Sequence, residues 1–200
     1  MNECKLSENN WTKVAVFAGG DRGHYRTDFD CFVGVDRGSL WVLEEKLPLA
    51  LAVGDFDSVT AEERHSIQKR AQHFVQAQPE KDDTDLELAL LTIFEKNPQA
   101  QVTIFGALGG RIDHMLANVF LPSNPKLAPY MRQIEIEDGQ NLIRYCPEGT
   151  SQLEPHSDYD YLAFMPVRDS QLTILGAKYE LTEENFFFKK VYASNEYIDR

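Results

Sequence analysis

The stretch LALAVGDFD (49–57) is a short apolar run that ends in a glycine and two aspartates. An apolar run of this length without polar alternation predicts a strand buried on both faces, which is the kind found in parallel sheets. Two earlier stretches, KVAVFAGG (13–20) and CFVGVD (31–36), have the same texture. The chain therefore repeats one pattern, a buried strand that ends in glycine or aspartate.

Helical patterns separate these strands. The predicted helices are GSLWVLEEK (38–46), TAEERHSIQKRAQ (60–72), TDLELALLTIFEKN (84–97) and RIDHMLANVFL (111–121), and the further strands are HFVQAQ (73–78) and QVTIFGALGG (101–110). Thr60 with Glu63, and Thr84 with Glu87, have the spacing of a capping box. Alternation of strand and helix predicts an α/β fold with a doubly wound, mostly parallel sheet and helices on both faces.

After Pro122 the texture changes. Residues 133–200 hold short strand-like runs separated by turn signals, namely IEIED, NLIRYC, YDYLAFMPV, QLTILGAKYEL and FFFKKVYAS. These runs predict antiparallel strands in a small all-β unit. We place the boundary in the Pro/Asn-rich segment LPSNPKLAPY (121–130), with an α/β domain at 1–128 and a β domain at 129–200.

Composition excludes several classes of protein. The 200 residues carry 32 acidic and 20 basic side chains, which gives a net charge of -12. A basic surface that binds nucleic acid is therefore not expected. No apolar run is long enough to span a bilayer. The first residues lack the basic and apolar pattern of a secretory signal, so we expect a cytoplasmic protein. Cys4, Cys31 and Cys146 are odd in number and far apart, and are interpreted as reduced, structural residues.

Acidic residues follow several of the predicted strands. In extended chain, Asp55 and Asp57 point to the same side while Phe56 turns into the core. Two carboxylates on one side suit a hard cation such as Mg²⁺. A polar turn that caps the next helix explains an isolated Asp-x-Asp equally well. The position at a strand end beside other acids, including Asp36, favours the metal site.

Lys81-Asp82-Asp83-Thr84-Asp85 forms a second cluster. Acids near a helix N-terminus are stabilised by the helix dipole, so a purely structural cap is one interpretation. Asp85 could also complete a metal site with Asp55 and Asp57, and Lys81 could reach a phosphate. The two interpretations are compatible, and both stay open at this point.

The stretch GALGGRIDH (106–114) joins a strand to a helix through glycines. Backbone N–H groups of such a loop can face an anion, and Arg111 adds a planar fork that suits phosphate oxygens. The stretch is neither a G-x-G-x-x-G nor a Walker A sequence. Structural glycines at a tight turn are the alternative explanation. His114 and Asn118 lie one helical turn apart.

Six motifs in this order resemble the thiamine pyrophosphokinase family of the bacterial type. They are GVDRG (34–38), GDFDS (54–58), DDTDLE (82–87), GALGGRIDH (106–114), GAKYEL (176–181) and SNE (194–196). The resemblance implies a C-terminal antiparallel β-sandwich that binds thiamine, and a homodimer with sites between subunits. It also implies transfer of the terminal diphosphate of ATP to the hydroxyethyl group of thiamine, which gives thiamine diphosphate and AMP.

The resemblance further implies residue roles. Asp55, Asp57 and Asp85 would hold Mg²⁺; Asp36, Lys81, Thr84, Gly109, Gly110 and Arg111 would bind ATP; Asp113, Tyr179, Ser194 and Asn195 would bind thiamine. Asp57, Asp113 and Arg111 are the expected catalytic residues, and Asp57 and Asp113 are alternative acceptors of the hydroxyl proton.

Two departures from the family pattern accompany the resemblance. The family pattern continues beyond SNE, so we expect the β-sandwich to lack its last strands, and Arg37 stands where the family more often has glycine. Two other functions are weighed against the main one. One is a metal-dependent glycosyltransferase that uses Asp55 and Asp57 as its Asp-x-Asp motif, and the other is a non-catalytic nucleotide- or thiamine-binding protein.

Overall fold

The computed structural model describes residues 11–78, 82–167, 171–182 and 190–198. The chain divides into two compact units, residues 1–149 and 150–200.

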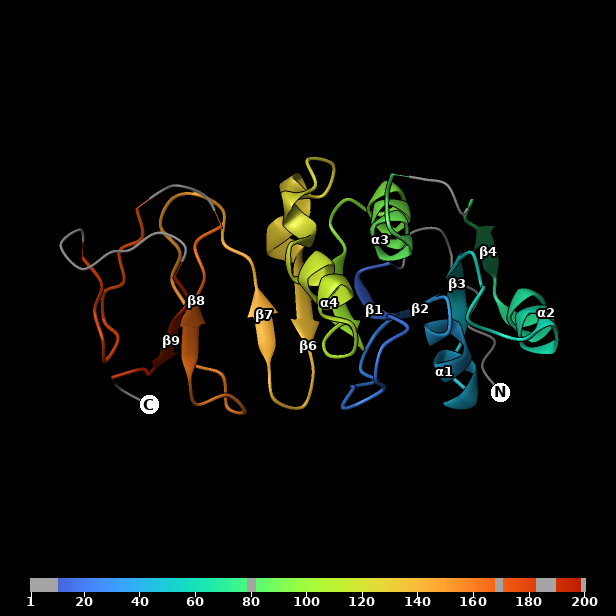
Figure 1. Ribbon diagram of the computed structural model, residues 1–200, viewed down its shortest axis with the longest axis horizontal. Helices are drawn as coiled ribbons and strands as arrows, with labels where there is room; N and C mark the ends of the chain where they lie inside the picture. The colour runs from blue at the N-terminus through green and yellow to red at the C-terminus, as the bar shows by residue number, and fades with distance from the viewer. Residues whose placement is uncertain (1–10, 79–81, 168–170, 183–189, 199–200) are drawn as a thin grey trace. The chain divides into compact units, whose positions relative to one another are not determined.

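The first unit is built on one sheet of seven strands (Figure 1). Their order across the sheet is β4 (His73–Gln76), β3 (Leu49–Gly54), β2 (Cys31–Val35), β1 (Lys13–Phe17), β5 (Gln101–Phe105), β6 (Ile134–Glu137) and β7 (Leu142–Arg144). All neighbouring strands are parallel except β6 and β7. The mostly parallel sheet predicted from the sequence is confirmed.

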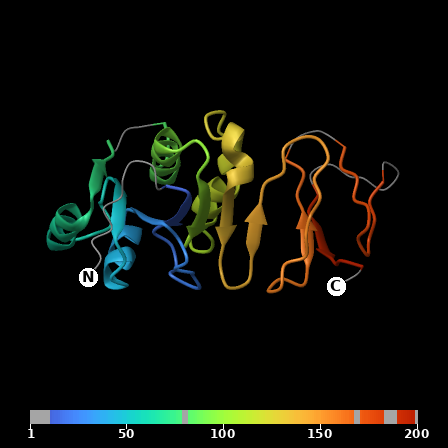
Figure 2. The same ribbon diagram turned by 180° about the vertical axis from the view of Figure 1, so that it is seen from behind.

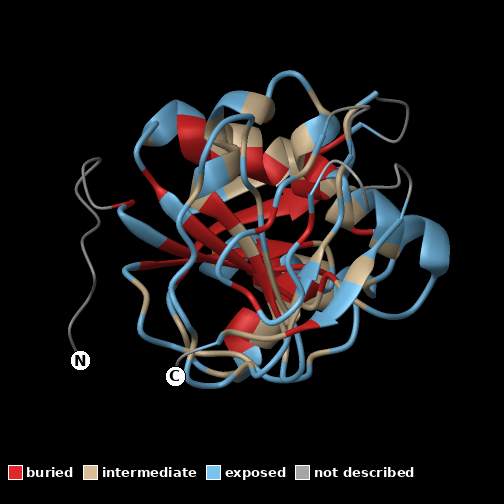
Figure 3. Cartoon of the chain, turned by 90° about the vertical axis from the view of Figure 1, so that its left-hand side faces the viewer, coloured by how far each residue is buried: buried red, intermediate tan, exposed pale blue. Residues whose placement is uncertain are grey.

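Helices cover both faces of this sheet, as Figures 1 and 2 show from opposite sides. The helices are α1 (Gly38–Glu44), α2 (Ala61–Arg70), α3 (Asp85–Lys96) and α4 (Ile112–Val119). α1 and α2 contribute Val42 and Ile67 to one apolar cluster, while α3 contributes Leu90 to the other. The strands between them form the buried centre, which is red in Figure 3.

Both predicted capping boxes form. The side chains of Thr60 and Thr84 accept hydrogen bonds from the backbone N–H groups of Glu63 and Glu87, and each glutamate accepts one in return. These bonds satisfy backbone donors that have no partner within the helix. One apolar face of α3 is also buried, at Leu86, Leu90, Ile93 and Phe94.

The assignment of 133–144 to the β domain is corrected by the structure. β6 pairs in parallel with β5, and β7 pairs with β6 as a hairpin, so both strands extend the large sheet. Ile134 and Ile136 are buried in the same apolar cluster as residues of β1 and β5. This burial favours the position of β6 beside β5 in the large sheet. The predicted boundary at 128/129 therefore differs from the division at 149/150, and the segment 121–133 forms two 3₁₀ helices, η1 (Leu121–Ser123) and η2 (Ala128–Gln133).

The second unit contains a small antiparallel sheet of β8 (Leu162–Phe164) and β9 (Tyr192–Asn195). The stretch QLTILGAKYEL forms isolated β-bridges and not a continuous strand, with Ile174 opposite Leu181 and Ala177 opposite Tyr197. Much of the predicted strand FFFKKVYAS lies outside the described residues. A β-sandwich stays a prediction for this unit.

Two further sequence predictions concern cysteines and membranes. Cys31 is buried in β2, whereas Cys146 is exposed, so of these two residues Cys31 is the one that a structural role fits. Cys4 lies outside the described residues. Across the part of the chain that the structure describes, no helix has the length and apolar character needed to cross a membrane.

Candidate active site

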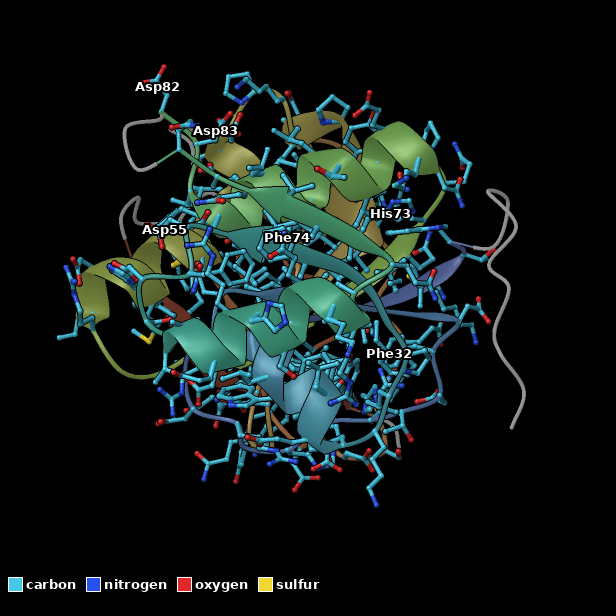
Figure 4. The ribbon with its side chains drawn as sticks, turned by 90° about the vertical axis from the view of Figure 1, so that its right-hand side faces the viewer. Phe32, Asp55, His73, Phe74, Asp82 and Asp83 are labelled. Carbon is cyan, nitrogen blue, oxygen red and sulfur yellow. The ribbon has the colours of Figure 1, made fainter. Side chains whose placement is uncertain are left out.

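The carboxyl ends of the parallel strands form one edge of the sheet. The chain builds the sheet from β1 outward to β4 and then returns to β5 on the other side of β1. In open α/β sheets, ligands bind at the carboxyl edge beside such a change of direction. Figure 4 shows Asp55, Asp82 and Asp83 toward one end of the sheet and His73, which begins β4, toward the other.

Three carboxylates converge at this edge. Asp36 follows β2, Asp55 follows β3, and Asp85 is the first residue of α3. One carboxylate oxygen from each lies within 4.8 Å of the other two, and all three side chains are half-buried. Three residues separated widely in the sequence therefore present oxygen ligands to one point.

Backbone geometry brings Asp36 and Asp55 together. Gly54 has a φ of 157°, and a Cβ atom there would lie 1.9 Å from Asp36 Oδ1, so a side chain at this position would displace the carboxylate. Phe56 follows with a φ of 60°, and its N–H donates to Asp36 Oδ1 at 3.1 Å. Its ring is buried and stacks on Phe74 with centroids 4.8 Å apart, as predicted for a residue that turns into the core.

The Asp36 carboxyl has a raised pKa, about 6 instead of 3.8. Burial is the largest cause, because a charged carboxylate loses hydration there. The charge of Asp85 raises the pKa further, and those of Asp55 and Asp57 add smaller contributions. The hydrogen bond from the Phe56 N–H acts in the opposite direction. Carboxylates that repel one another in this way are suited to a cation that neutralises them.

Asp57 is not in this group of three, although the sequence places it among the metal ligands. The positive φ of Phe56 breaks the extended chain on which the prediction depended, so Asp55 and Asp57 do not follow strand geometry. The Asp57 N–H instead donates to Asp55 Oδ1 at 3.0 Å. Asp36, predicted to contact ATP, occupies the third position.

The acidic segment before α3 is partly described. Thr84 is engaged in the capping box, so the structural interpretation of this residue is confirmed, while Asp85 joins the carboxylate group. The metal-site interpretation of Asp85 stays a prediction. Lys81, predicted to contact a phosphate, lies outside the described residues.

The loop after β5 turns through two glycines, and whether it binds an anion stays a prediction. Gly109 and Gly110 both have positive φ values, 83° and 69°, which glycine adopts without a steric penalty. Asn118 Nδ2 donates to the carbonyl oxygen of Ala107 at 2.8 Å and so fixes the loop to α4.

Arg111 and Asp113 form an exposed pair at the start of α4. Arg111 Nε lies 3.2 Å from Asp113 Oδ1, and Arg111 Nη2 lies 2.6 Å from Asp113 Oδ2. The hydrogen bonds from Arg111 lower the pKa of Asp113, and Asp113 raises the pKa of Arg111. Asp113 is therefore a weaker base in this arrangement than an isolated aspartate.

Three of the predicted thiamine-binding residues meet in the second unit. Asn195 is buried, accepts a hydrogen bond from the Tyr179 N–H at 2.9 Å and donates to the Tyr179 carbonyl at 2.7 Å. Tyr179 leaves its ring exposed, and Ser194 has a φ of 60°. Asp113, the fourth, belongs to the first unit.

Two residues that contact the acidic segment before α3 belong to no sequence motif. Asn124 and Lys126 contact Asp83, and Asn124 also contacts Glu87. Both lie in the Pro/Asn-rich segment that was interpreted as a domain boundary. A local pattern carries no signal for contacts that join positions about forty residues apart, so sequence reasoning could not have found them.

The donor set of the carboxylate group fits a hard divalent cation. Mg²⁺ prefers oxygen ligands and is usually held by one or two carboxylates together with substrate phosphates. A glycine turn and an arginine fork, such as those after β5, are groups that can bind phosphates themselves. The arrangement can therefore bind a metal–polyphosphate and neutralise charge that develops on it.

Family models match most of the chain. The model for the thiamin pyrophosphokinase catalytic domain matches residues 23–132, and the model for the thiamin pyrophosphokinase vitamin B1 binding domain matches residues 150–200.

Relatives agree with these matches. The thiamine pyrophosphokinase of Bacillus subtilis is 36% identical over 84% of this chain and 81% of its own length. A crystal structure of a thiamin pyrophosphokinase family protein from Enterococcus faecalis has a TM-score of 0.85 at 44% identity, covering 94% of this chain and 91% of that one. The Bacillus subtilis crystal structure has a TM-score of 0.73 at 33% identity, with 94% and 90% covered.

Proposed function

The chain belongs to the thiamin pyrophosphokinase family and is an enzyme of that kind, and from this premise we propose that it uses ATP and Mg²⁺ to form thiamine diphosphate from thiamine. The proposed reaction moves the terminal diphosphate of ATP as one unit. The hydroxyethyl oxygen of thiamine attacks the β-phosphorus, the bond from that phosphorus to the oxygen of the α-phosphate breaks, and AMP leaves.

The convergence of Asp36, Asp55 and Asp85 carries this proposal. Attack on a polyphosphate brings negatively charged groups together, so catalysis depends on positioning and on charge neutralisation. Mg²⁺ bound to these carboxylates would supply part of that neutralisation. The raised pKa of Asp36, which burial causes first and the charge of Asp85 second, is consistent with the assignment, because a bound cation would offset both the lost hydration and the repulsion.

The other phosphate contacts are assigned to the loop after β5 and to the segment before α3. Gly109 and Gly110 present backbone N–H groups, and Arg111 exchanges its fork from Asp113 to phosphate oxygens when ATP binds. Lys81 and Thr84 are assigned to the same anion. Thr84 retains its hydroxyl proton as a donor while its oxygen accepts from Glu87.

The hydroxyl proton passes to an aspartate, for which Asp57 and Asp113 are the candidates. A loose transition state needs the proton removed only late, so a carboxylate of modest basicity is sufficient. Arg111 lowers the pKa of Asp113 while the pair is intact. Release of Arg111 to a phosphate restores the basicity of Asp113, which keeps it a candidate beside Asp57.

At the thiamine end, Tyr179 offers an exposed ring that can stack on a heterocycle. Asn195 holds the backbone of Tyr179 through two hydrogen bonds and therefore fixes the position from which the ring projects. Ser194 is the other proposed thiamine contact of this unit. The family match to residues 150–200 and the resemblance of the motifs support these three roles, and the resemblance also assigns a thiamine contact to Asp113.

The test is ³¹P NMR of the protein with ATP, thiamine and Mg²⁺, followed over time. AMP that appears in step with thiamine diphosphate is the expected result. ADP with thiamine monophosphate would contradict diphosphate transfer. In a second sample, in which a UDP- or GDP-sugar replaces ATP, release of a nucleoside diphosphate would favour the glycosyltransferase instead.

Two variants test the proposed roles of Asp55 and Asp57. Asp55→Asn is expected to lower the rate by orders of magnitude, because it removes a ligand charge from the group of three. Asp57→Asn is expected to do the same with folding nearly intact, as judged by thermal unfolding. A rate within about threefold of the unmodified enzyme would remove Asp57 from the machinery.

A further inference from the structure

Three side chains join the segment between η1 and η2 to the start of α3. Asn124 Nδ2 lies 2.9 Å from Glu87 Oε1 and 3.3 Å from Asp83 Oδ1. Lys126 Nζ lies 2.6 Å from Asp83 Oδ2. Asp83 and Glu87 stand on either side of Asp85, so these contacts enclose the residue that α3 contributes to the carboxylate group.

The amide of Asn124 connects two structures that are far apart in the sequence. Glu87 Oε2 accepts the Thr84 N–H at 2.7 Å in the capping box, while its other oxygen accepts from Asn124. The same amide nitrogen donates to Asp83 before the cap. The first turn of α3 is thereby bonded from both sides of its N-cap to the segment at Asn124.

The positive charge of Lys126 lies close to the acidic side chains at the start of α3. Its hydrogen bond with Asp83 is the largest cause of its raised pKa, and the charges of Asp83, Asp82 and Glu87 contribute as well. Acids placed this close repel one another unless a cation is near. The ammonium group therefore favours the arrangement in which Asp83 lies against the segment at Asn124.

The capping box by itself is enough to begin a helix, because α2 carries the same box between Thr60 and Glu63. The contacts from Asn124 and Lys126 are therefore not needed to begin α3, and they have a different effect. They tie the start of α3 to a segment with its own packing, in which Leu121 and Leu127 are buried in the apolar cluster of the sheet. They therefore constrain where α3 begins relative to the sheet, and so where Asp85 lies relative to Asp36 and Asp55.

We propose that Asn124, with Lys126, is a positioning residue that holds the Asp85 carboxylate in register with those of Asp36 and Asp55 for binding of a divalent cation. The inference rests on the proposed metal role of these carboxylates. Neither Asn124 nor Lys126 is a ligand in this arrangement; both act through Asp83 and Glu87.

Asn124→Asp is the decisive variant. Asn124 Oδ1 accepts the Lys126 N–H at 3.0 Å, and aspartate keeps this acceptor and the side-chain shape. Only the two amide donations to Asp83 and Glu87 are replaced, by repulsion between carboxylates. The added negative charge by itself would attract a cation, whereas loss of position would weaken its binding. The added charge alone would therefore lower the dissociation constant of the cation, whereas loss of position would raise it.

The measurement is Mn²⁺ binding without nucleotide or thiamine, from the electron paramagnetic resonance signal of the free ion. We expect Asn124→Asp to raise the dissociation constant about tenfold, the size typical for loss of hydrogen bonds to charged groups. Lys126→Met also makes the chain more negative and is expected to weaken binding, which gives a second reading if the first variant folds poorly. Gln99→Glu, on the exposed loop between α3 and β5, adds the same charge as Asn124→Asp and is expected to leave binding unchanged.

The outcomes separate the inference from the function on which it rests. If the unmodified protein binds Mn²⁺ no better than Asp55→Asn does, the metal role of the carboxylates fails and the inference falls with it. If binding depends on Asp55 but is equal or tighter in Asn124→Asp and Lys126→Met, only the positioning role is overturned. At saturating Mg²⁺ the turnover rate of Asn124→Asp should return toward that of the unmodified enzyme, whereas a defect that excess Mg²⁺ does not reduce would contradict the inference.

Discussion

At the scale of single residues, Asp36 shows how a fold changes the chemistry of a side chain. The sequence shows an aspartate at the end of a strand, and any exposed aspartate is ionised at neutral pH. In the structure its carboxyl is half-buried beside Asp85 and Asp55, and its pKa is raised to about 6. The folded protein therefore holds this proton more firmly than the unfolded chain does.

This shift predicts how stability changes with pH. The neutral carboxyl stabilises the fold fully below its ordinary pKa of 3.8, and that contribution is lost as the pH rises through about 6. In the absence of divalent cations, Asp36→Asn should therefore be more stable than the unmodified protein at pH 8 by about 1–2 kcal/mol, allowing for partial exposure. Urea unfolding at pH 4 and pH 8 measures this. A difference that does not change with pH would contradict the raised pKa.

Arg111 provides a second prediction at this scale. A guanidinium can bind two oxygens in one plane, whereas an ammonium group is a point charge. Arg111→Lys should therefore lower kcat/KM for ATP about tenfold or more and leave the midpoint of thermal unfolding nearly unchanged, because the residue is exposed. Steady-state kinetics with varied ATP measures the effect. Near-normal kinetics would remove Arg111 from the phosphate site.

At the scale of elements, the loop between β1 and β2 is held to β6 by one arginine. Arg26 Nε and Nη2 lie 3.1 Å and 2.9 Å from the two oxygens of Glu137, which is buried, and Arg26 Nη1 lies 3.1 Å from Asp28. The hydrogen bond with Glu137 is the largest cause of the raised pKa of Arg26. His24 is also near, with Nε2 3.9 Å from Glu137 Oε1.

Removal of Arg26 alone should lower the free energy of unfolding by more than the net contribution of the Arg26–Glu137 ion pair. Arg26→Met leaves the buried Glu137 carboxylate without its main partner, and we expect a loss of about 2–4 kcal/mol in the free energy of unfolding. The double variant Arg26→Met/Glu137→Met should recover most of it, because an apolar pair replaces a buried ion pair at little cost. A double-mutant cycle by urea unfolding at pH 8 measures this, and additive losses would contradict it.

At the scale of the whole molecule, we expect a homodimer, as the family resemblance implies. α4 presents Ile112 and Leu116, which are one turn apart and 70% and 44% exposed. Apolar side chains grouped on a surface are typical of an interface. Sedimentation should give a particle of twice the 22.8 kDa chain mass, and Leu116→Glu should shift it toward the monomer. A monomer at micromolar concentration would contradict this expectation.

Local patterns predicted most strands and helices of the first unit and the edge of the sheet at which its carboxylates meet. Apolar runs that end in glycine and aspartate predicted the strands, the spacing of Thr84 and Glu87 predicted the start of a helix, and parallel strands bring their carboxyl ends to one edge. These features depend on a few neighbouring residues, so the sequence by itself was sufficient for them.

Only the tertiary structure decided which side chains meet at that edge. The left-handed φ of Phe56 breaks the strand-like alternation between Asp55 and Asp57, and the group of three takes Asp36 in place of Asp57. β6 joins β5 because its isoleucines are buried in a core made by other strands, and Asn124 reaches Glu87 across thirty-seven positions. Contacts of this kind depend on strand order and on backbone angles set by packing, and no local pattern encodes either.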